Sequence, residues 1–306
     1  MRMKRQEVIR SLKGIIAPVV TPFNRRGDVD EGGFRENLVR SADSGLAGIL
    51  VAGSSGEAPY LTESERLRLV EIARSVIKPP GILLVGTGFE STSATLRLSR
   101  EVEARGADAL LVLTPNYFKP RMDADAMLAH YRTVASGVKC PVLIYSIPQF
   151  TGLMVDPVTL GKLSRIPNLV GLKESSGKLD YVRAILRRVR PGFRVLVGSV
   201  AILYESLRAG ATGGVLNQAD FAPALCVALY EAFLHRRTRE VHALQQRLLA
   251  LAQSIAVPYG MPGLKAALDL SGYQGGYPRL PLLPVSRKAK EQIRAALAEA
   301  RAGLDF

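Results

Sequence analysis

The sequence has few of the residues that mark disulfide and metal proteins, since it contains two cysteines, three histidines and no tryptophan. Cys140 and Cys226 lie far apart and belong to no Cys-x-x-Cys motif or Cys/His cluster. Neither a disulfide framework nor a zinc site is therefore predicted. We expect both cysteines to be small buried hydrophobic residues.

Long apolar runs are also absent. No stretch approaches the roughly 20 apolar residues that a membrane-spanning helix needs. The opening segment 1–14 lacks the apolar centre of a secretory signal peptide. We therefore expect a soluble, cytoplasmic protein with no membrane partner.

The chain is short of acidic residues: 27 Asp and Glu stand against 41 Lys and Arg, which gives a formal net charge of +14. An excess of this kind can attract nucleic-acid phosphates. Here the basic residues are scattered through helical segments such as 66–78 and 234–249, interleaved with acids and without aromatic stacking positions. We interpret them as solvated helix faces and predict no nucleic-acid partner. The positive surface would instead steer small anionic substrates toward a cleft.

Eight short runs rich in leucine and β-branched residues recur at fairly regular intervals. They are continuously apolar, as are strands of a parallel sheet that is covered on both faces. Segments with helical apolar periodicity lie between them, and several end at a glycine that suits a left-handed C-cap. The candidate strands are 14–20, 48–53, 81–88, 107–115, 141–148, 169–177, 194–199 and 213–218.

Eight alternating strand and helix units predict a closed (β/α)₈ TIM barrel rather than an open, doubly wound sheet. We expect the barrel over residues 14–235 and a C-terminal helical extension over 236–306. No low-complexity linker interrupts the chain, so a single domain over 1–306 is predicted. The helical stretches after the eighth strand lie at about 221–257, 262–271 and 286–302.

The reactive groups of a TIM barrel come from the carboxyl ends of its strands and the loops that follow. Lys173 lies near the end of the sixth run, where its amine could simply reach to water. A desolvated amine at the same place would have a lowered pKa and could condense with a ketone. Tyr145 lies near the end of the fifth run, where it could either pack or move protons for that condensation. Their adjacent strands strengthen the catalytic interpretation of both.

A glycine-rich turn follows the second run. Gly53 and Gly56 bracket the hydroxyls of Ser54 and Ser55, and such a turn offers N–H and hydroxyl groups to a carboxylate. A purely structural role is the alternative, because Gly-Ser turns are common. Tyr117, in the loop after the fourth run, could likewise be a simple surface aromatic.

In combination, three segments resemble the dihydrodipicolinate synthase and N-acetylneuraminate lyase family of Schiff-base barrel enzymes. They are GSSGE at 53–57, YSIPQFTG at 145–152 and GLKESSG at 171–177, and they occur in the expected order. The resemblance extends from 14–23 to 262–268. It implies a homotetramer built from dimers, and a lysine that acts as the electron sink without any metal or organic cofactor.

The resemblance also implies roles by position. Lys173 would be the Schiff-base nucleophile that attacks pyruvate or a related 2-keto acid, and Tyr145 would be the proton shuttle. Ser54 would belong to the proton relay. Ser55 would hold the keto-acid carboxylate.

Four further residues complete the predicted site. Tyr117 matches the tyrosine that family members insert into a neighbouring subunit's site, and Val215 matches a position whose backbone lines the pyruvate pocket. Ser175 lies two residues beyond Lys173, so both face the barrel interior if the strand continues. Its hydroxyl could then help to bind a distal carboxylate. Gly198, at the end of the seventh run, is also predicted to bind substrate.

Departures from the family pattern bear on the substrate. Synthases that accept aspartate semialdehyde resemble one another in carrying an arginine just before the Thr-Gly pair. This chain has Phe150 there, which cannot make the bidentate carboxylate contact of an arginine. Ser146, Ser175 and Ser199 look like the 4-hydroxy-2-oxoglutarate aldolase branch, which releases pyruvate and glyoxylate.

Three functions stay open. The leading prediction is reversible cleavage of 4-hydroxy-2-oxoglutarate, or of a related 2-keto acid, to pyruvate and an aldehyde. The alternative is condensation of pyruvate with aspartate semialdehyde, as in dihydrodipicolinate synthase. An alternative of another class is a noncatalytic barrel that only binds a keto acid, although a pure binder needs neither Lys173 nor Tyr145.

Overall fold

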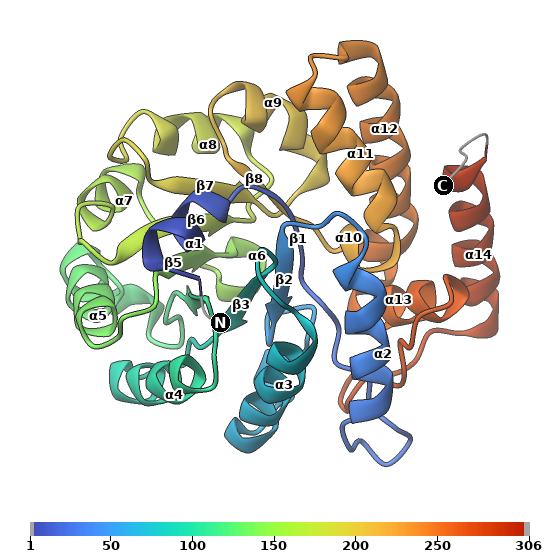
Figure 1. Cartoon of the computed structure of the whole chain (residues 1–306), viewed down its shortest axis with the longest axis horizontal. Coiled ribbons are helices and arrows are strands. Elements are labelled where there is room, and N and C mark those ends of the chain that lie inside the picture. The colour runs from blue at the N-terminus through green and yellow to red at the C-terminus, as the bar shows by residue number, and fades with distance from the viewer. Residues whose placement is uncertain (1–2, 303–306) are drawn as a thin grey trace.

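The computed structural model describes residues 3–302 and contains a closed barrel of eight parallel strands surrounded by helices (Figure 1). Each strand pairs with the next one along the chain, and β1 pairs with β8 to close the barrel. The predicted (β/α)₈ TIM barrel is therefore confirmed. The strands are β1 (Gly14–Ala17), β2 (Gly48–Val51), β3 (Ile82–Gly86), β4 (Ala109–Leu113), β5 (Val142–Ser146), β6 (Leu169–Glu174), β7 (Arg194–Val197) and β8 (Gly213–Val215).

Each predicted apolar run contains one of these strands, but the strands end before the runs do. The chain after β2 illustrates the reason. Ala52 has a φ of 52°, so the backbone turns into the glycine-rich segment 53–56 instead of continuing the ladder. Residues at the carboxyl ends thus leave the sheet while they still lie at its edge, which is where a TIM barrel carries its reactive groups.

Helices cover the outside of the barrel, and several begin at a side chain that caps their free N–H groups. They are α2 (Glu31–Ala42), α3 (Glu63–Val76), α4 (Thr92–Ala104), α5 (Ala124–Ser136), α7 (Pro157–Leu163), α8 (Leu179–Leu186), α9 (Leu203–Arg208) and α11 (Pro223–Leu234). The short helices α6 (Pro148–Thr151) and α10 (Gln218–Phe221) instead follow the carboxyl ends of β5 and β8. At the start of α3, Thr62 Oγ1 accepts from Glu65 N while the Glu65 carboxylate accepts from Thr62 N. This capping box fixes where the helix begins.

A helix that the sequence did not predict, α1 (Arg5–Ser11), lies across the amino-terminal end of the barrel (Figure 1). Val8 and the following Leu12 are buried and join the cluster inside the barrel. Arg194 of β7 holds this helix by donating from Nε to Ile9 O at 3.0 Å. A seven-residue helix with a single buried position gives no periodicity that could be recognised in the sequence.

Side chains that alternate along the strands build two separate layers of core. Leu50 and Leu84 belong to the cluster inside the barrel, whereas Val51 and Val85 belong to the cluster between the barrel and its helices. Tyr145 belongs to the inner cluster. Successive residues of a strand face opposite sides, so this alternation decides which residues can reach the barrel mouth.

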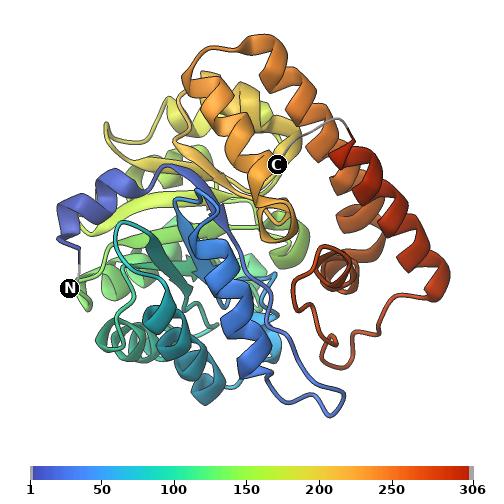
Figure 2. The same cartoon turned by 45° about the vertical axis from the view of Figure 1, so that its right-hand side comes forward.

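Beyond α11 the chain forms the predicted C-terminal helical extension, which packs along one side of the barrel (Figure 2). It consists of α12 (Thr238–Leu251), the π-helical turn η4 (Ala252–Ala256), α13 (Val257–Leu270) and α14 (Arg287–Arg301). The predicted stretch 221–257 is divided rather than continuous, because residues 235–237 separate α11 from α12 and Arg236 has a φ of 57°.

The extension shares its buried surface with the barrel. Leu248 and Leu264 belong to the same cluster as the residues between the strands and the outer helices. We therefore propose that the chain forms one domain, with the extension starting near residue 236. Residues 1–2 and 303–306 of the predicted domain lie outside the described residues.

Cys140 and Cys226 are both buried, as predicted. Within residues 3–302, no helix is long and apolar enough to cross a membrane. The same residues contain no group of three or more His, Cys, Asp or Glu side chains placed to hold a metal ion.

Candidate active site

Lys173 and Tyr145 lie side by side at the carboxyl end of the barrel. They are register partners on β6 and β5, and each residue is 5% exposed. Lys173 Nζ lies 4.2 Å from the centroid of the Tyr145 ring, which is within the range of a cation–π contact. The two predicted catalytic groups are thus adjacent and almost shielded from water.

The phenol of Tyr145 is linked to the glycine-rich turn after β2. Its Oη lies 3.2 Å from Ser54 Oγ, and either hydroxyl can donate. The turn itself is fixed by Gly56 N, which donates to Gly53 O at 3.1 Å, and by Thr21 Oγ1, which donates to Gly56 O at 2.8 Å. A phenol and a hydroxyl in contact beside an amine form a path along which a proton can move.

A small cavity of about 150 Å³ lies in front of Lys173. This volume is the share of about five water molecules in the liquid, which suits a small organic acid. Every predicted site residue except Tyr117 lines it. These residues are Ser54, Ser55, Tyr145, Lys173, Ser175, Gly198 and Val215.

Ser175 lies at the cavity wall just beyond the end of β6. Its backbone N donates to Ser146 O at 3.0 Å, and its carbonyl accepts from Gln149 Nε2 at 2.9 Å. A Cβ at Gly198 would lie 2.0 Å from Ser175 Oγ and 2.9 Å from Ser175 Cβ. Glycine at position 198 therefore makes the room that the Ser175 side chain occupies.

Tyr117 is the predicted residue that the structure does not bring to this cavity. It lies in the loop after β4, is 76% exposed, and packs edge-on against Phe118 with ring centroids 5.0 Å apart. Its backbone N donates to Glu90 Oε2 at 2.9 Å, which holds the loop. The expected insertion into a neighbouring subunit's site concerns a second copy of the chain and stays a prediction.

Several lining residues carry no signal of their own in the sequence. Gln149 comes from α6, Asn217 follows β8, and Gly260 with Met261 comes from α13. Gly260 has a φ of 52° inside α13, so the helix is broken there. A glycine flanked by prolines could have marked this break, but nothing in the sequence says that the break faces the barrel mouth.

A buried ion pair ties the extension to the glycine-rich turn. Lys265 Nζ lies 2.6 Å from Glu57 Oε1. Lys265 also donates to Thr21 O at 2.8 Å and Tyr277 O at 2.7 Å, while Arg279 N donates to Glu57 Oε2 at 2.9 Å. Burial lowers the pKa of Lys265 to about 8, and the charge of Glu57 opposes that shift. The turn is thus held by groups from the far end of the chain.

Two buried carboxyl groups near the carboxyl ends of the strands have raised pKa values. Burial raises the pKa of Asp220 to about 7, although a hydrogen bond from Val20 N at 2.8 Å opposes the shift. Burial also raises the pKa of Glu174, whose Oε1 accepts from Ser176 N at 2.6 Å. Asp220 therefore keeps its proton over part of the range below pH 7 in which an exposed aspartate has lost it.

The sequence and the fold match known proteins over most of the chain. The sequence profile described as the Dihydrodipicolinate synthetase family matches residues 11–300. The 4-hydroxy-tetrahydrodipicolinate synthase of Moorella thermoacetica is 33% identical over 285 residues, which cover 93% of this chain and 97% of that protein.

Two solved structures agree with this result. A dihydrodipicolinate synthase from Cyanidioschyzon merolae with lysine bound has a TM-score of 0.88 and 30% identity, covering 95% of this chain and 98% of its own. YagE, a prophage protein of the dihydrodipicolinic acid synthase family from E. coli K12, in complex with pyruvate, has a TM-score of 0.89 and 26% identity, covering 94% and 98%. This chain belongs to the dihydrodipicolinate synthetase family and is an enzyme of the class I aldolase type.

Proposed function

We propose that the protein forms a Schiff base between Lys173 and the C2 carbonyl of pyruvate or another 2-keto acid, and so breaks or forms the C3–C4 bond. One observation carries the proposal: an almost buried lysine contacts a tyrosine whose phenol meets the Ser54 hydroxyl, at the wall of a cavity sized for a small acid. A noncatalytic binding barrel would need neither the amine nor the hydroxyl relay.

The chemical steps follow from this arrangement. The Lys173 amine attacks C2, and the carbinolamine loses water as Tyr145 gives a proton to the departing oxygen. The protonated imine withdraws electrons from C3, so that C3–C4 breaks as the 4-hydroxyl loses its proton to Tyr145. C3 of the resulting enamine then takes a proton, and water hydrolyses the imine to release pyruvate and the free amine. In the synthetic direction the C3 enamine attacks an aldehyde carbon, and water then hydrolyses the imine. Ser54 exchanges the proton with Tyr145.

Ser55 and the backbone at Val215 are proposed to hold the carboxylate of the keto acid. Ser55 belongs to a turn whose hydroxyl and N–H groups suit an anion. Both residues line the same cavity as Lys173. Neutral donors can orient the carboxylate there without a second amine that would compete for the carbonyl.

The carbonyl partner is proposed to be glyoxylate, which makes 4-hydroxy-2-oxoglutarate the substrate. The Ser175 hydroxyl, at the wall next to Gly198, is a donor for the distal carboxylate. The alternative, condensation with aspartate semialdehyde, has the support of the Moorella thermoacetica relative's name. Phe150 makes aspartate semialdehyde the less suitable partner, because a phenyl ring offers no hydrogen-bond donor to its carboxylate.

We further propose a homotetramer built from dimers, in which Tyr117 enters the site of a neighbouring subunit. Support comes from the exposure of Tyr117 and Phe118, two adjacent aromatic rings that an interface would shelter. Glu90 holds their loop in place by accepting from Asn116 N at 2.8 Å and Tyr117 N at 2.9 Å. Sedimentation equilibrium measures the assembly mass, and a monomer at micromolar concentration would contradict this part of the proposal.

Treatment with pyruvate and sodium borohydride, followed by intact-mass and peptide analysis, tests the central step. We expect one reduced pyruvate adduct on Lys173 and none in Lys173→Ala. Pyruvate release from 4-hydroxy-2-oxoglutarate then tests the proposed substrate, and consumption of aspartate semialdehyde with pyruvate tests the alternative. A folded wild-type protein without the adduct would leave only the noncatalytic alternative.

A further inference from the structure

A second, larger cavity of about 740 Å³ adjoins the Lys173 cavity at the barrel mouth. The two cavities share part of their walls, namely Ser54, Tyr145, Ile147, Phe150, Gly260 and Met261. A molecule attached to Lys173 can therefore extend past the two hydroxyls into the larger space.

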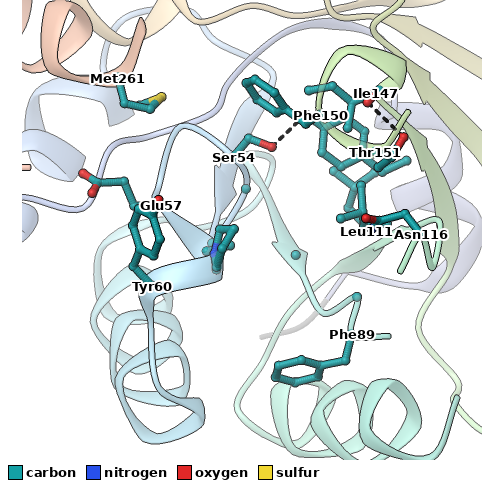
Figure 3. Close-up of a pocket in the computed structure, with 18 of the residues that line it drawn as sticks. Ser54, Glu57, Tyr60, Phe89, Leu111, Asn116, Ile147, Phe150, Thr151 and Met261 are labelled. Carbon is teal, nitrogen blue, oxygen red and sulfur yellow. Dashed lines mark hydrogen bonds between the residues drawn. The ribbon is translucent and has the colours of Figure 1, made fainter. Parts of the chain in front are cut away.

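Apolar surface makes up most of the wall of this larger cavity. In Figure 3, Ile147 and Phe150 lie beside Ser54, while Phe89 lies farther out. Leu111 lies on β4 below Ile147 in the same view. The Lys173 cavity, which carries the hydroxyls and the amine, thus opens directly onto the apolar wall of the larger cavity.

The acidic groups in this wall are already engaged by the protein. Glu57 forms the 2.6 Å ion pair with Lys265. Glu90 accepts hydrogen bonds from Asn116 N and Tyr117 N, and also from Asn116 Nδ2 at 2.9 Å. Glu57 therefore stabilises the fold and Glu90 stabilises the loop after β4. Both carboxylates already have partners within the protein and need no cationic ligand.

The one arginine in the wall is engaged as well. Arg66 donates from its terminal nitrogen to Ala58 O at 2.5 Å, and its guanidinium carbon lies 4.6 Å from the centroid of the Phe89 ring. The residue is buried, and its Nε has no hydrogen-bond partner among the described residues. Arg66 thus supports the aromatic wall through the face of its guanidinium group, which lies over the Phe89 ring.

We propose that this site also accepts, as carbonyl partner of the pyruvate enamine, an aldehyde with an apolar aromatic substituent that occupies the larger cavity. The inference rests on the proposed Schiff-base function and adds a substrate class to it. The hydroxyls that the boundary of the two cavities offers to the reacting oxygen are those of Tyr145 and Ser54. An aldehyde oxygen held there points its substituent toward Phe150 and Ile147.

The reaction balances without any further reagent. C3 of the Lys173 enamine attacks the aldehyde carbon and forms the C3–C4 bond, and the aldehyde oxygen takes a proton from Tyr145. Water hydrolyses the imine and releases a 4-aryl-4-hydroxy-2-oxobutanoate together with the free amine. The reverse sequence cleaves such an acid to pyruvate and the aromatic aldehyde.

The apolar wall favours a large apolar substituent over a small one such as a methyl group. Removal of apolar surface from water is favourable roughly in proportion to the area buried. Glyoxylate fits within the inner cavity and leaves the larger one to water, whereas a phenyl ring displaces that water from Leu111, Ile147 and Phe150. Among aldehydes without a carboxylate, those with larger apolar groups should therefore be the better partners.

Condensation of pyruvate with benzaldehyde, acetaldehyde and glyoxylate tests the inference. The Lys173 adduct is measured first on the same preparation with borohydride, and the condensation products are then quantified by mass spectrometry. We expect kcat/KM for benzaldehyde to exceed that for acetaldehyde by about 10- to 200-fold, the range over which apolar pockets discriminate.

A matched pair of variants locates the substituent. Phe150→Ala should lower the ratio of benzaldehyde to acetaldehyde kcat/KM by about tenfold, because the phenyl wall is lost. Leu283→Ala is the control, since Leu283 is 68% exposed against 69% for Phe150 and lies outside both cavities. It should keep the wild-type ratio.

The outcomes separate this inference from the function on which it rests. An adduct on Lys173 with no preference for benzaldehyde, or with a ratio that Phe150→Ala leaves unchanged, would overturn the inference and leave the Schiff-base function standing. The apolar wall would then be better explained as the seat of Tyr117 from a second copy. No adduct on Lys173 would overturn the proposed function itself.

Discussion

The carboxylate of Glu57 and the ammonium of Lys265 lie 2.6 Å apart, with side chains that are only 1% and 2% exposed. Glu57 follows directly on the turn that carries Ser54 and Ser55, and Lys265 lies on α13 of the extension. The extension is therefore joined to the candidate active site by a charge pair as well as by packing. Loss of either partner would leave the other charge buried.

Lys265→Met should destabilise the protein strongly. Removal of one partner of a buried ion pair costs about 3–5 kcal/mol, because the remaining charge has no solvent. We expect a lower urea midpoint for Lys265→Met than for wild type. The midpoint should fall by less in the double variant Lys265→Met/Glu57→Gln, since the two changes remove the same interaction. Arg287→Ala breaks an exposed pair with Glu291 and should leave the midpoint unchanged within error. Equal midpoints for Lys265→Met and wild type would contradict the role of the pair.

Asp220 should make the stability depend on pH between about 4 and about 7. Its folded pKa of about 7 lies above the ordinary value of 3.8. As pH rises through this window the unfolded chain releases the proton first, so the wild-type free energy of unfolding falls, and it levels off above the folded pKa. Asp220→Asn keeps an acceptor for Val20 N and does not titrate.

The advantage of Asp220→Asn over wild type should accordingly grow from pH 4 to pH 7 and then stay constant. Urea denaturation at closely spaced pH values measures this difference. Asp43→Asn, at an exposed position after α2, is the control and should leave the pH dependence as it is. Parallel curves for Asp220→Asn and wild type would contradict the raised pKa.

The barrel and the contact between Lys173 and Tyr145 could be predicted because their signals are local. Strands buried on both faces are continuously apolar, and eight of them alternate with amphipathic helices. Lys173 and Tyr145 lie near the ends of consecutive runs, and consecutive strands of a barrel are neighbours, so their contact follows from chain order. The position of Ser54 could be predicted for the same reason, because it follows the end of a strand and so lies at the same carboxyl end of the barrel.

The features that the sequence did not predict depend on contacts between segments that lie far apart in the sequence. Nothing near Glu57 indicates that Lys265 neutralises it, because the pairing depends on where α13 docks. The larger cavity escaped prediction in a similar way. Leu111, Ile147 and Met261 each resemble ordinary core residues in the sequence, and only the fold brings them around one space.

Tyr145→Phe should separate packing from proton transfer. The ring that contacts Lys173 is kept, while the hydroxyl that meets Ser54 at 3.2 Å is lost. We expect kcat to fall by about 10²- to 10⁴-fold, the usual contribution of a positioned acid or base, with an adduct that still forms slowly on Lys173. Steady-state kinetics and borohydride trapping measure the two effects. Tyr204→Phe, at a ring outside both cavities, is the control and should retain activity.

Gly198→Ala should disturb the distal part of the site. The new Cβ would lie 2.0 Å from Ser175 Oγ and 2.9 Å from Ser175 Cβ, so rotation of the hydroxyl alone cannot relieve the contact. A displacement of this size can reduce kcat/KM about 100-fold. Gly32→Ala, whose Cβ would meet only Asp30 Oδ1 at 3.5 Å, is the matched control. Equal kcat/KM values for the two variants would exclude position 198 from the site.

Phe150→Arg should turn the site toward aldehydes that carry a carboxylate. Phe150 lies in the wall of both cavities and is largely exposed, so an arginine can replace it without repacking the core. Its guanidinium would supply the planar pair of donors that the phenyl ring lacks. Hydrogen bonds to charged groups contribute about 1.5–3 kcal/mol, so we expect kcat/KM for aspartate semialdehyde to rise about 10- to 100-fold. The gain should shrink at high salt.

Phe150→Leu is the matched control for this change, because it removes the ring without adding a charge. It should leave the rate with aspartate semialdehyde low. If both variants gained equally, the ring would be acting only as a steric block, and the charge at position 150 would not decide the substrate. If only the arginine variant gained while its rate with benzaldehyde fell, one residue would determine whether the outer cavity receives a carboxylate or an apolar group.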